Sequence, residues 1–193
     1  MAKLYFRYGA MGSGKSIDLL KTSFNYKERG QKTLILTSII DNRYGEGKVK
    51  SRIGIEENAI SVSSDDSVLE IFKKNCKVDC VLVDEVQFLT EKQIIELGDI
   101  VDIYDIPVIA YGLISDFKQE LFPGSKALLG ICDTIENIPV VCWCGKKATV
   151  NSRLLDGKVI YDGDQILVGG NESYISLCRK HWKEGKIKSE NEN

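Results

Sequence analysis

The segment GAMGSGKS at residues 9–16 constrains this chain more than any other feature. It matches the pattern G-x-x-x-x-G-K-[ST] at every fixed position, and it stands between a strand-like stretch and a stretch with helical spacing. Glycines let such a loop curl until several backbone N–H groups point at one phosphate, and the N-terminus of the following helix adds positive potential. The alternative is a chance glycine turn with an exposed lysine, which would not need this context.

We therefore expect a phosphate loop that binds ATP. Lys15 is expected to reach the β- and γ-phosphates, and Ser16 to bind Mg²⁺. The expected ATP-binding residues of the loop are Gly9, Ala10, Met11, Gly12, Ser13, Gly14, Lys15 and Ser16.

The first 135 or so residues alternate between strand-like and helix-like segments. Apolar runs predict strands over 3–8, 32–38, 79–84 and 107–112, and apolar spacing predicts helices over 15–29, 65–75 and 90–104. In the first helix, Leu19, Leu20 and Phe24 are expected on one face, with Gly30 as a C-terminal cap. Continuous apolar strands that alternate with helices predict an α/β fold with a mostly parallel sheet and helices on both faces.

The character of the sequence changes after about Pro139, where cysteines cluster, glycines recur and helical periodicity fades. We expect an ATP-binding α/β domain over residues 1–138 and a small domain of short strands and turns over 139–182. The polar stretch 183–193 is expected to be a frayed tail.

Composition excludes several classes of protein. The chain of 193 residues is 43% hydrophobic and 28% charged, which is typical of a globular protein, and its net charge of −2 does not favour a strongly basic nucleic-acid binder. The sequence shows neither a run long enough for a membrane helix nor the apolar core of a signal peptide, so we expect a cytoplasmic protein without membrane or nucleic-acid partners. The single histidine, His181, is the one that any Ser-His-Asp or Cys-His hydrolase would have to use.

A pair of acids follows the apolar stretch at 79–84. Asp84 ends this predicted strand and Glu85 comes next. Ligands of parallel sheets bind outside the carboxyl ends of the strands, so both acids should lie beside the phosphate loop. Asp84 suits a supporting role toward Mg²⁺, and Glu85 could accept a proton from an attacking hydroxyl or water. A surface pair of acids without catalytic duty is the alternative.

Cysteines and the histidine form two short pairs, Cys142 with Cys144 and Cys178 with His181. The C-x-x-H spacing of the second pair is a good half-site for zinc, whereas C-x-C in the first is tighter than usual. Four such ligands suit tetrahedral Zn²⁺ and would tie a loop together; the alternative is a core cysteine beside an incidental pair. The other three, Cys76, Cys80 and Cys132, are expected to be plain buried residues.

The chain resembles the type II (cytosolic, zinc-containing) thymidine kinase family along essentially its whole length. The motifs that carry the resemblance occur in family order: GAMGSGKS at 9–16, DNRY at 41–44, DEVQF at 84–88, YGLISDF at 111–117, LFPGSKALL at 121–129 and QILVGGNESYISLCRKHW at 165–182.

The resemblance implies a P-loop core joined to a small zinc domain whose long loop, the lasso, closes over the nucleoside. It implies that Glu85 is the catalytic base, that Arg43 lies near the transferring phosphate, and that Asp41 helps to order the water shell of the metal. The implied nucleoside-binding residues are Phe88, Phe117, Phe122, Val168, Gly169, Gly170 and Tyr174. Read without the family, the aromatic residues among them would be ordinary packing residues and Arg43 a solvated loop residue.

The resemblance also implies the substrates and the regulation. We expect transfer of the γ-phosphate of ATP to the 5′-hydroxyl of thymidine, with deoxyuridine also accepted, feedback inhibition by thymidine triphosphate, and a homotetramer. The chain departs from the family in its C-x-C pair and in Ser51-Arg52, where the family often has Ser-His.

Two other classes of function fit part of the sequence. A nucleic-acid-dependent ATPase would use the phosphate loop and the acidic pair, with Trp143 as a base-stacking residue, but the chain is short and slightly acidic. A nucleotide-regulated binding protein would use ATP only to change shape.

Overall fold

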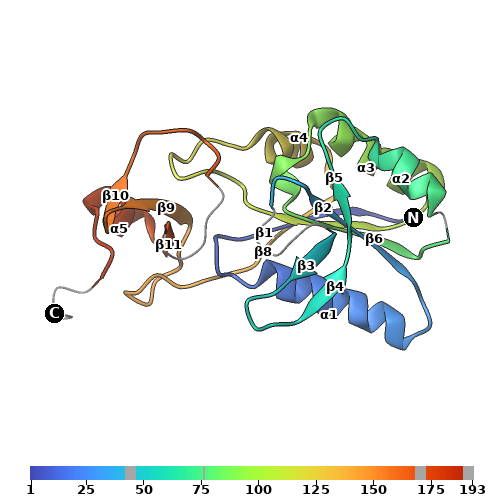
Figure 1. The fold of residues 1–193 in the computed structure, drawn as a ribbon, viewed down its shortest axis with the longest axis horizontal. Coiled ribbons are helices and arrows are strands. Elements are labelled where there is room, and N and C mark those ends of the chain that lie inside the picture. Colours follow the sequence, from blue (N-terminus) through green and yellow to red (C-terminus); the bar gives the residue numbers. More distant parts are fainter. Residues whose placement is uncertain (42–46, 76, 168–172, 189–193) are drawn as a thin grey trace.

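The structure is a computed structural model and describes residues 1–41, 47–75, 77–167 and 173–188. Its core is a six-stranded sheet in which every pair of neighbouring strands is parallel (Figure 1). The strands in spatial order are β5 (Ile60–Val62), β2 (Thr33–Ser38), β6 (Cys80–Asp84), β7 (Val108–Gly112), β1 (Leu4–Tyr8) and β8 (Thr134–Asn137). The predicted mostly parallel sheet is confirmed, and β6 and β7 are buried along their whole length.

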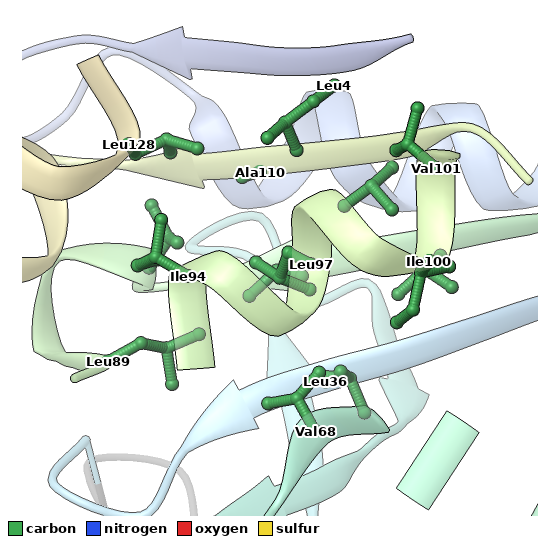
Figure 2. Close-up of a cluster of buried hydrophobic side chains, with 14 of the residues drawn as sticks. Leu4, Leu36, Val68, Leu89, Ile94, Leu97, Ile100, Val101, Ala110 and Leu128 are labelled. Atoms are coloured by element: carbon green, nitrogen blue, oxygen red, sulfur yellow. The ribbon is translucent and has the colours of Figure 1, made fainter. Parts of the chain in front are cut away.

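Helices cover both faces of this sheet, as predicted. Helix α1 (Lys15–Glu28) lies on one face, and α2 (Val68–Lys74), α3 (Glu91–Tyr104) and α4 (Pro123–Ile131) lie on the other (Figure 1). Figure 2 shows the second face, where side chains of α3 such as Leu97 pack toward the strands. Each apolar strand therefore buries side chains on both of its faces, which explains the continuous apolar runs.

Local sequence explains where these helices begin. Thr90 caps α3 in a capping box with Gln93, so the helix begins at Glu91. The helix ends at Tyr104, because the next residue, Asp105, has a left-handed backbone. Ser67 caps α2, and its side chain accepts a hydrogen bond from the backbone of Glu70, so α2 begins at Val68, later than the predicted residue 65. The expectation for Phe24 was wrong, because its side chain is 57% exposed and does not share the buried face of α1.

Sequence periodicity did not predict four of the strands or helix α4. Strand β8 is an edge strand with little buried surface, and β3 (Lys48–Lys50), β4 (Glu56–Asn58) and β5 have three residues each. Such short strands show no period of their own, and only pairing with a neighbour makes them strands. The nine residues of α4 are likewise too few for a clear helical pattern.

A small antiparallel sheet lies beyond the carboxyl ends of the core strands (Figure 1). Its strands are β10 (Lys158–Ile160), β9 (Val150–Leu155) and β11 (Tyr174–Leu177), in that spatial order, and helix α5 (Arg179–Glu184) follows them. Short strands and turns were expected here, whereas α5 was not predicted and ends two residues beyond residue 182. Among the described residues, no helix has both the length and the apolar character needed to cross a membrane.

Candidate active site

The loop between β1 and α1 requires glycine at both of its ends, at Gly14 because of its backbone conformation and at Gly9 because of close packing. Gly14 has a φ of +85° and caps α1 without any side-chain hydrogen bond, which leaves the N–H groups of the first turn for an anion. A Cβ atom at Gly9 would come within 2.4 Å of the Ser13 hydroxyl and 2.5 Å of the Ile138 carbonyl. The loop is therefore packed too tightly at Gly9 for any side chain.

Lys15 and Ser16 begin α1 and turn toward different partners. The Lys15 ammonium donates hydrogen bonds to the carbonyls of Gly9 and Ala10, at 3.0 and 3.1 Å. The Ser16 hydroxyl donates to Oδ2 of Asp84 at 2.8 Å, so the end of β6 meets the start of α1. The acidic pair thus lies beside the loop, at the carboxyl edge of the sheet.

Asp84 is a buried carboxylate whose charged form is disfavoured by its surroundings. Burial, with the neighbouring charge of Glu85 as a second cause, raises the pKa of Asp84 to about 7, even though Ser16 and the backbone of Glu85 donate to it. A divalent cation would offset both causes. The Ser16 hydroxyl beside two carboxylates is a set of hard oxygen donors, which is the chemistry that Mg²⁺ prefers, so these residues fit the expected metal.

Glu85 has an unusual backbone and a specific partner. Its φ of 51° and ψ of 40° lie in the left-handed region, which turns the chain sharply from β6 into the 3₁₀ helix η1 (Val86–Phe88). The Gln87 amide donates a hydrogen bond of 2.6 Å to Oε2 of Glu85, while its own oxygen accepts 3.0 Å from the backbone of Leu113. Gln87 is buried and holds the Glu85 carboxylate against the loop after β7. Its role could not be predicted from the sequence, because one glutamine carries no spacing signal.

A cavity of about 320 Å³ opens beside these groups. It brings together residues predicted from separate motifs. The predicted residues that line it are Met11, Gly12, Gly14, Lys15, Ser16, Asp41, Glu85, Phe88, Phe117, Phe122 and Tyr174. Gly9, Ala10, Ser13 and Asp84 lie outside this lining, and Arg43, Val168, Gly169 and Gly170 lie outside the residues that the structure describes.

Aromatic side chains form one wall of the cavity. The rings of Phe88 and Phe122 meet edge to face with centroids 5.8 Å apart. Phe117 is 1% exposed, and the guanidinium of Arg153 stacks on its ring, 4.0 Å from the centroid. Arg153 also donates to the hydroxyl of Tyr174. These rings are therefore preorganised by their neighbours, and Arg153 is a buried cation that no motif indicated.

The turn between β3 and β4 forms a further wall of the cavity, which no sequence motif indicated. Ser51, Arg52 and Ile53 line the cavity there. One nitrogen of the Arg52 guanidinium lies 3.7 Å from the position of a Cβ built on Gly12. The departure from the family pattern at Ser51-Arg52 is thus located beside the phosphate loop.

Cys142, Cys144, Cys178 and His181 form one cluster, with ligand atoms within 4.8 Å of one another. Nδ1 of His181 lies 3.5 Å from the sulfurs of Cys142 and Cys178, and the sulfurs of Cys144 and Cys178 are 4.0 Å apart. Tetrahedral zinc with ordinary bond lengths would separate a sulfur from a nitrogen by about 3.6 Å and two sulfurs by about 3.8 Å. The donor atoms thus fit zinc in chemistry and in spacing.

The tight C-x-C pair reaches this cluster through a turn. The backbone of Gly145 donates to the carbonyl of Cys142 at 2.8 Å, which curls the chain so that both sulfurs approach His181. The Trp143 ring stacks on His181 with centroids 4.1 Å apart. As for the other cysteines, Cys80 is buried and Cys132 half-buried, in agreement with a packing role, and Cys76 lies outside the described residues.

A glycine loop joins β1 to α1, and no side chain caps the start of α1. Asp84, at the end of β6, accepts a hydrogen bond from Ser16 at the start of α1. This arrangement defines a P-loop protein that binds nucleoside triphosphates. Comparison with known proteins narrows this class. The family model "Thymidine kinase" matches residues 2–182, and the chain belongs to this family.

Two thymidine kinases are similar to this chain over nearly its whole length. The chain is 52% identical to a thymidine kinase of Haemophilus influenzae, over 95% of this chain and 97% of the relative. It is 50% identical to a thymidine kinase of Rhodopirellula baltica, over 95% of this chain and 89% of the relative. A solved structure of DnaA from Aquifex aeolicus with bound AMPPCP matches at a TM-score of 0.44 and 19% identity, over 73% of this chain and 42% of that chain.

Proposed function

We propose that the cavity is the active site of a thymidine kinase, which transfers the γ-phosphate of ATP to the 5′-hydroxyl of thymidine and yields thymidine monophosphate for nucleotide salvage. The observation that carries this proposal is that the phosphate loop, Glu85 and the aromatic wall line one cavity. Phosphoryl transfer requires alignment, charge neutralisation and exclusion of water more than covalent help from the protein.

ATP would bind with its phosphates on residues 9–16, where Lys15 and Arg43 balance the charge of the phosphoryl oxygens. Mg²⁺ would be held by Ser16, with Asp84 and Asp41 in support, and when bound it neutralises charge on the β- and γ-phosphates. The 5′-oxygen forms a bond to the γ-phosphorus while the bond to the ADP oxygen breaks. Glu85 accepts the proton of the hydroxyl. Its 8% exposure and its hydrogen bond from Gln87 support a carboxylate held in one orientation.

Thymidine would lie against Phe88, Phe117, Phe122 and Tyr174, with its base held by backbone groups of the lasso near residues 168–170. A pocket for one methyl group discriminates only about 10–200-fold, so deoxyuridine should be a second substrate. Purine nucleosides should be poor substrates, because hydrogen bonds to the pyrimidine edge would be lost.

The cysteine–histidine cluster would hold structural Zn²⁺ through Cys142, Cys144, Cys178 and His181. The metal would tie the turn at 142–145 to the start of α5 and stabilise the small sheet. This role supports the division into an ATP-binding domain over 1–138, a zinc-binding lasso domain over 139–182 and a tail.

Family membership also supports a homotetramer that is inhibited by thymidine triphosphate. Light scattering of the purified chain and inhibition curves with that nucleotide test the two statements separately. The cytoplasmic location expected from the sequence stays a prediction.

The decisive experiment combines a nucleoside panel with one substitution. With labelled ATP, the wild type should phosphorylate thymidine and deoxyuridine far faster than purine nucleosides. Glu85→Gln should keep ATP binding and lose about 10²–10⁴-fold in turnover. Unchanged turnover would remove Glu85 from the role of base, and a preferred purine acceptor would end the thymidine assignment. ATP hydrolysis stimulated by DNA without nucleoside phosphorylation would favour the nucleic-acid-dependent ATPase.

A further inference from the structure

Met11, in the middle of the phosphate loop, is held by the small sheet at both of its backbone polar groups. Its N–H donates a hydrogen bond of 2.7 Å to Oδ1 of Asn151 on β9. Its carbonyl accepts a hydrogen bond of 2.5 Å from the hydroxyl of Ser176 on β11. Asn151 and Ser176 are directly opposite each other in the β9–β11 pairing, so one cross-strand pair binds both the N–H and the carbonyl of Met11.

The next cross-strand pair on the same face holds the aromatic side of the cavity. Arg153 is opposite Tyr174 and donates to its hydroxyl at 2.7 and 3.0 Å. Arg153 also donates to the carbonyl of Asp164 at 2.6 Å and stacks on the ring of Phe117. Residues two apart on a strand lie about 7 Å from one another, so both cross-strand pairs belong to one short stretch of the β9–β11 pairing.

Asn151 has a further contact that joins the two regions. Its amide nitrogen donates 3.3 Å to the carbonyl of Ser115, in the loop between β7 and Phe117. Asn151 is 5% exposed and lines the cavity itself. A single buried amide thus connects the phosphate loop, the loop that carries an aromatic wall residue and the small sheet.

We propose that Asn151 and Ser176 are positioning residues, which set the distance and angle between the phosphate loop and the nucleoside pocket. The inference rests on the proposed function, because it places ATP on the loop and the nucleoside against the wall that Arg153 and Tyr174 hold. In-line transfer needs the reacting atoms about 3–3.5 Å apart, and a displacement of about 1 Å can cost about 100-fold in rate. The β9–β11 pair lies at the carboxyl end of the core sheet, where it can set that distance (Figure 1).

Positioning has a kinetic signature that simple stabilisation lacks. Each substrate keeps its own contacts when the connection between the sites is broken, so the separate affinities should change little. The transition state requires both substrates in register, so turnover should fall. A merely structural role would lower stability and leave turnover of the folded fraction unchanged.

The test is Ser176→Ala in the full-length protein, which removes the hydroxyl that holds the Met11 carbonyl. We expect kcat to fall about 10- to 100-fold, while the Kd values for an ATP analogue alone and for thymidine alone stay within about 3-fold of the wild type. Ser176→Thr, which keeps a hydroxyl on a strand position, should restore most of the turnover.

Ser152→Ala is the matched control. Ser152 lies on β9 with its side chain on the opposite face from Asn151, and its hydroxyl is buried without a hydrogen-bond partner in the described part of the chain. This variant should keep wild-type kcat.

Asn151→Ala provides a second measurement through the same loop residue. Its effect on kcat should be less than additive with that of Ser176→Ala, because both act on Met11. Urea unfolding and zinc content of each variant establish that the protein is folded.

Wild-type kcat in Ser176→Ala, or equal losses in Ser176→Ala and Ser152→Ala, would overturn the proposal. So would a loss confined to ATP affinity, which would make Ser176 part of the ATP site alone. Failure of the proposed function would look different, because the wild type itself would then not phosphorylate thymidine.

Discussion

Gln87 offers a test of how the Glu85 carboxylate is held. The amide of Gln87 joins Glu85 Oε2 at 2.6 Å to the backbone N–H of Leu113 at 3.0 Å, and its side chain is 1% exposed. Gln87→Met keeps the length of the side chain and removes both hydrogen bonds. The carboxylate of Glu85 would then lose the hydrogen bond from Gln87, and the N–H of Leu113 would lose the Gln87 oxygen as its acceptor.

The loss of each of these two hydrogen bonds should lower the free energy of unfolding. A hydrogen bond to a charged group contributes about 1.5–3 kcal/mol, and an unpaired N–H in a partly buried site costs about 1–3 kcal/mol. We therefore expect Gln87→Met to lower the free energy of unfolding by about 2.5–6 kcal/mol. Less precise orientation of the proposed base should also lower kcat about 10- to 100-fold, because proton transfer to Glu85 would need its carboxylate within hydrogen-bond reach of the 5′-hydroxyl.

Gln93→Met separates the two effects. Gln93 is also 1% exposed, and its amide donates to the carbonyls of Ser63 and Asp66 at 2.7 and 2.9 Å, at the start of α3 and away from the cavity. This variant should lose comparable stability and keep wild-type kcat. Urea unfolding measures the first quantity, and thymidine phosphorylation at a temperature where both variants are folded measures the second. Equal kcat in the two variants would refute the positioning of Glu85 by Gln87.

Three further predictions concern stability. Burial disfavours the charged form of Asp18, but Lys21 and Arg7 outweigh burial and hold the pKa of the Asp18 carboxyl below its usual range. Asp18→Asn should therefore lower the free energy of unfolding by about 1–2 kcal/mol at pH 7. In urea titrations this difference should disappear as the pH falls below about 4, where the carboxyl becomes protonated. A Cβ at Gly124 would lie 2.6 Å from two backbone carbonyl oxygens around η1, so Gly124→Ala should lower the free energy of unfolding by about 1–3 kcal/mol or more; an unchanged urea midpoint would contradict this. Cys142→Ser should reduce zinc per chain and lower Tm by about 5–10 °C, as measured by elemental analysis and calorimetry; full zinc content would exclude Cys142 as a ligand.

Local patterns predicted the framework of the site well. The phosphate loop could be recognised at residues 9–16 because its geometry is built from neighbouring residues, with glycines at the turns and a helix start directly behind them. Parallel-strand topology then placed Asp84 beside Ser16, 68 residues away, because the carboxyl ends of parallel strands share one edge. The pair Cys178 and His181 carried its own spacing signal in the same way, and the pair Cys142 and Cys144 carried a weaker one because its spacing is tighter than usual.

Long-range packing decided the rest. Met11 meets Asn151 across 140 residues, and no spacing rule connects them. Arg153 looks in the sequence like an ordinary strand residue, yet the fold buries its charge between Phe117 and Tyr174.

The sequence by itself therefore determined the residue types of the site, because the phosphate loop and each of the two pairs at 142–144 and 178–181 are made of residues at short spacings. The tertiary structure alone decided how the Glu85 carboxylate and the phosphate loop are oriented. Gln87 reaches Glu85 only because the left-handed turn at Glu85 starts η1, and β9 meets the phosphate loop only because the small sheet packs at the carboxyl end of the core. Alignment is a property of contacts between distant segments, and such contacts leave no period in the sequence.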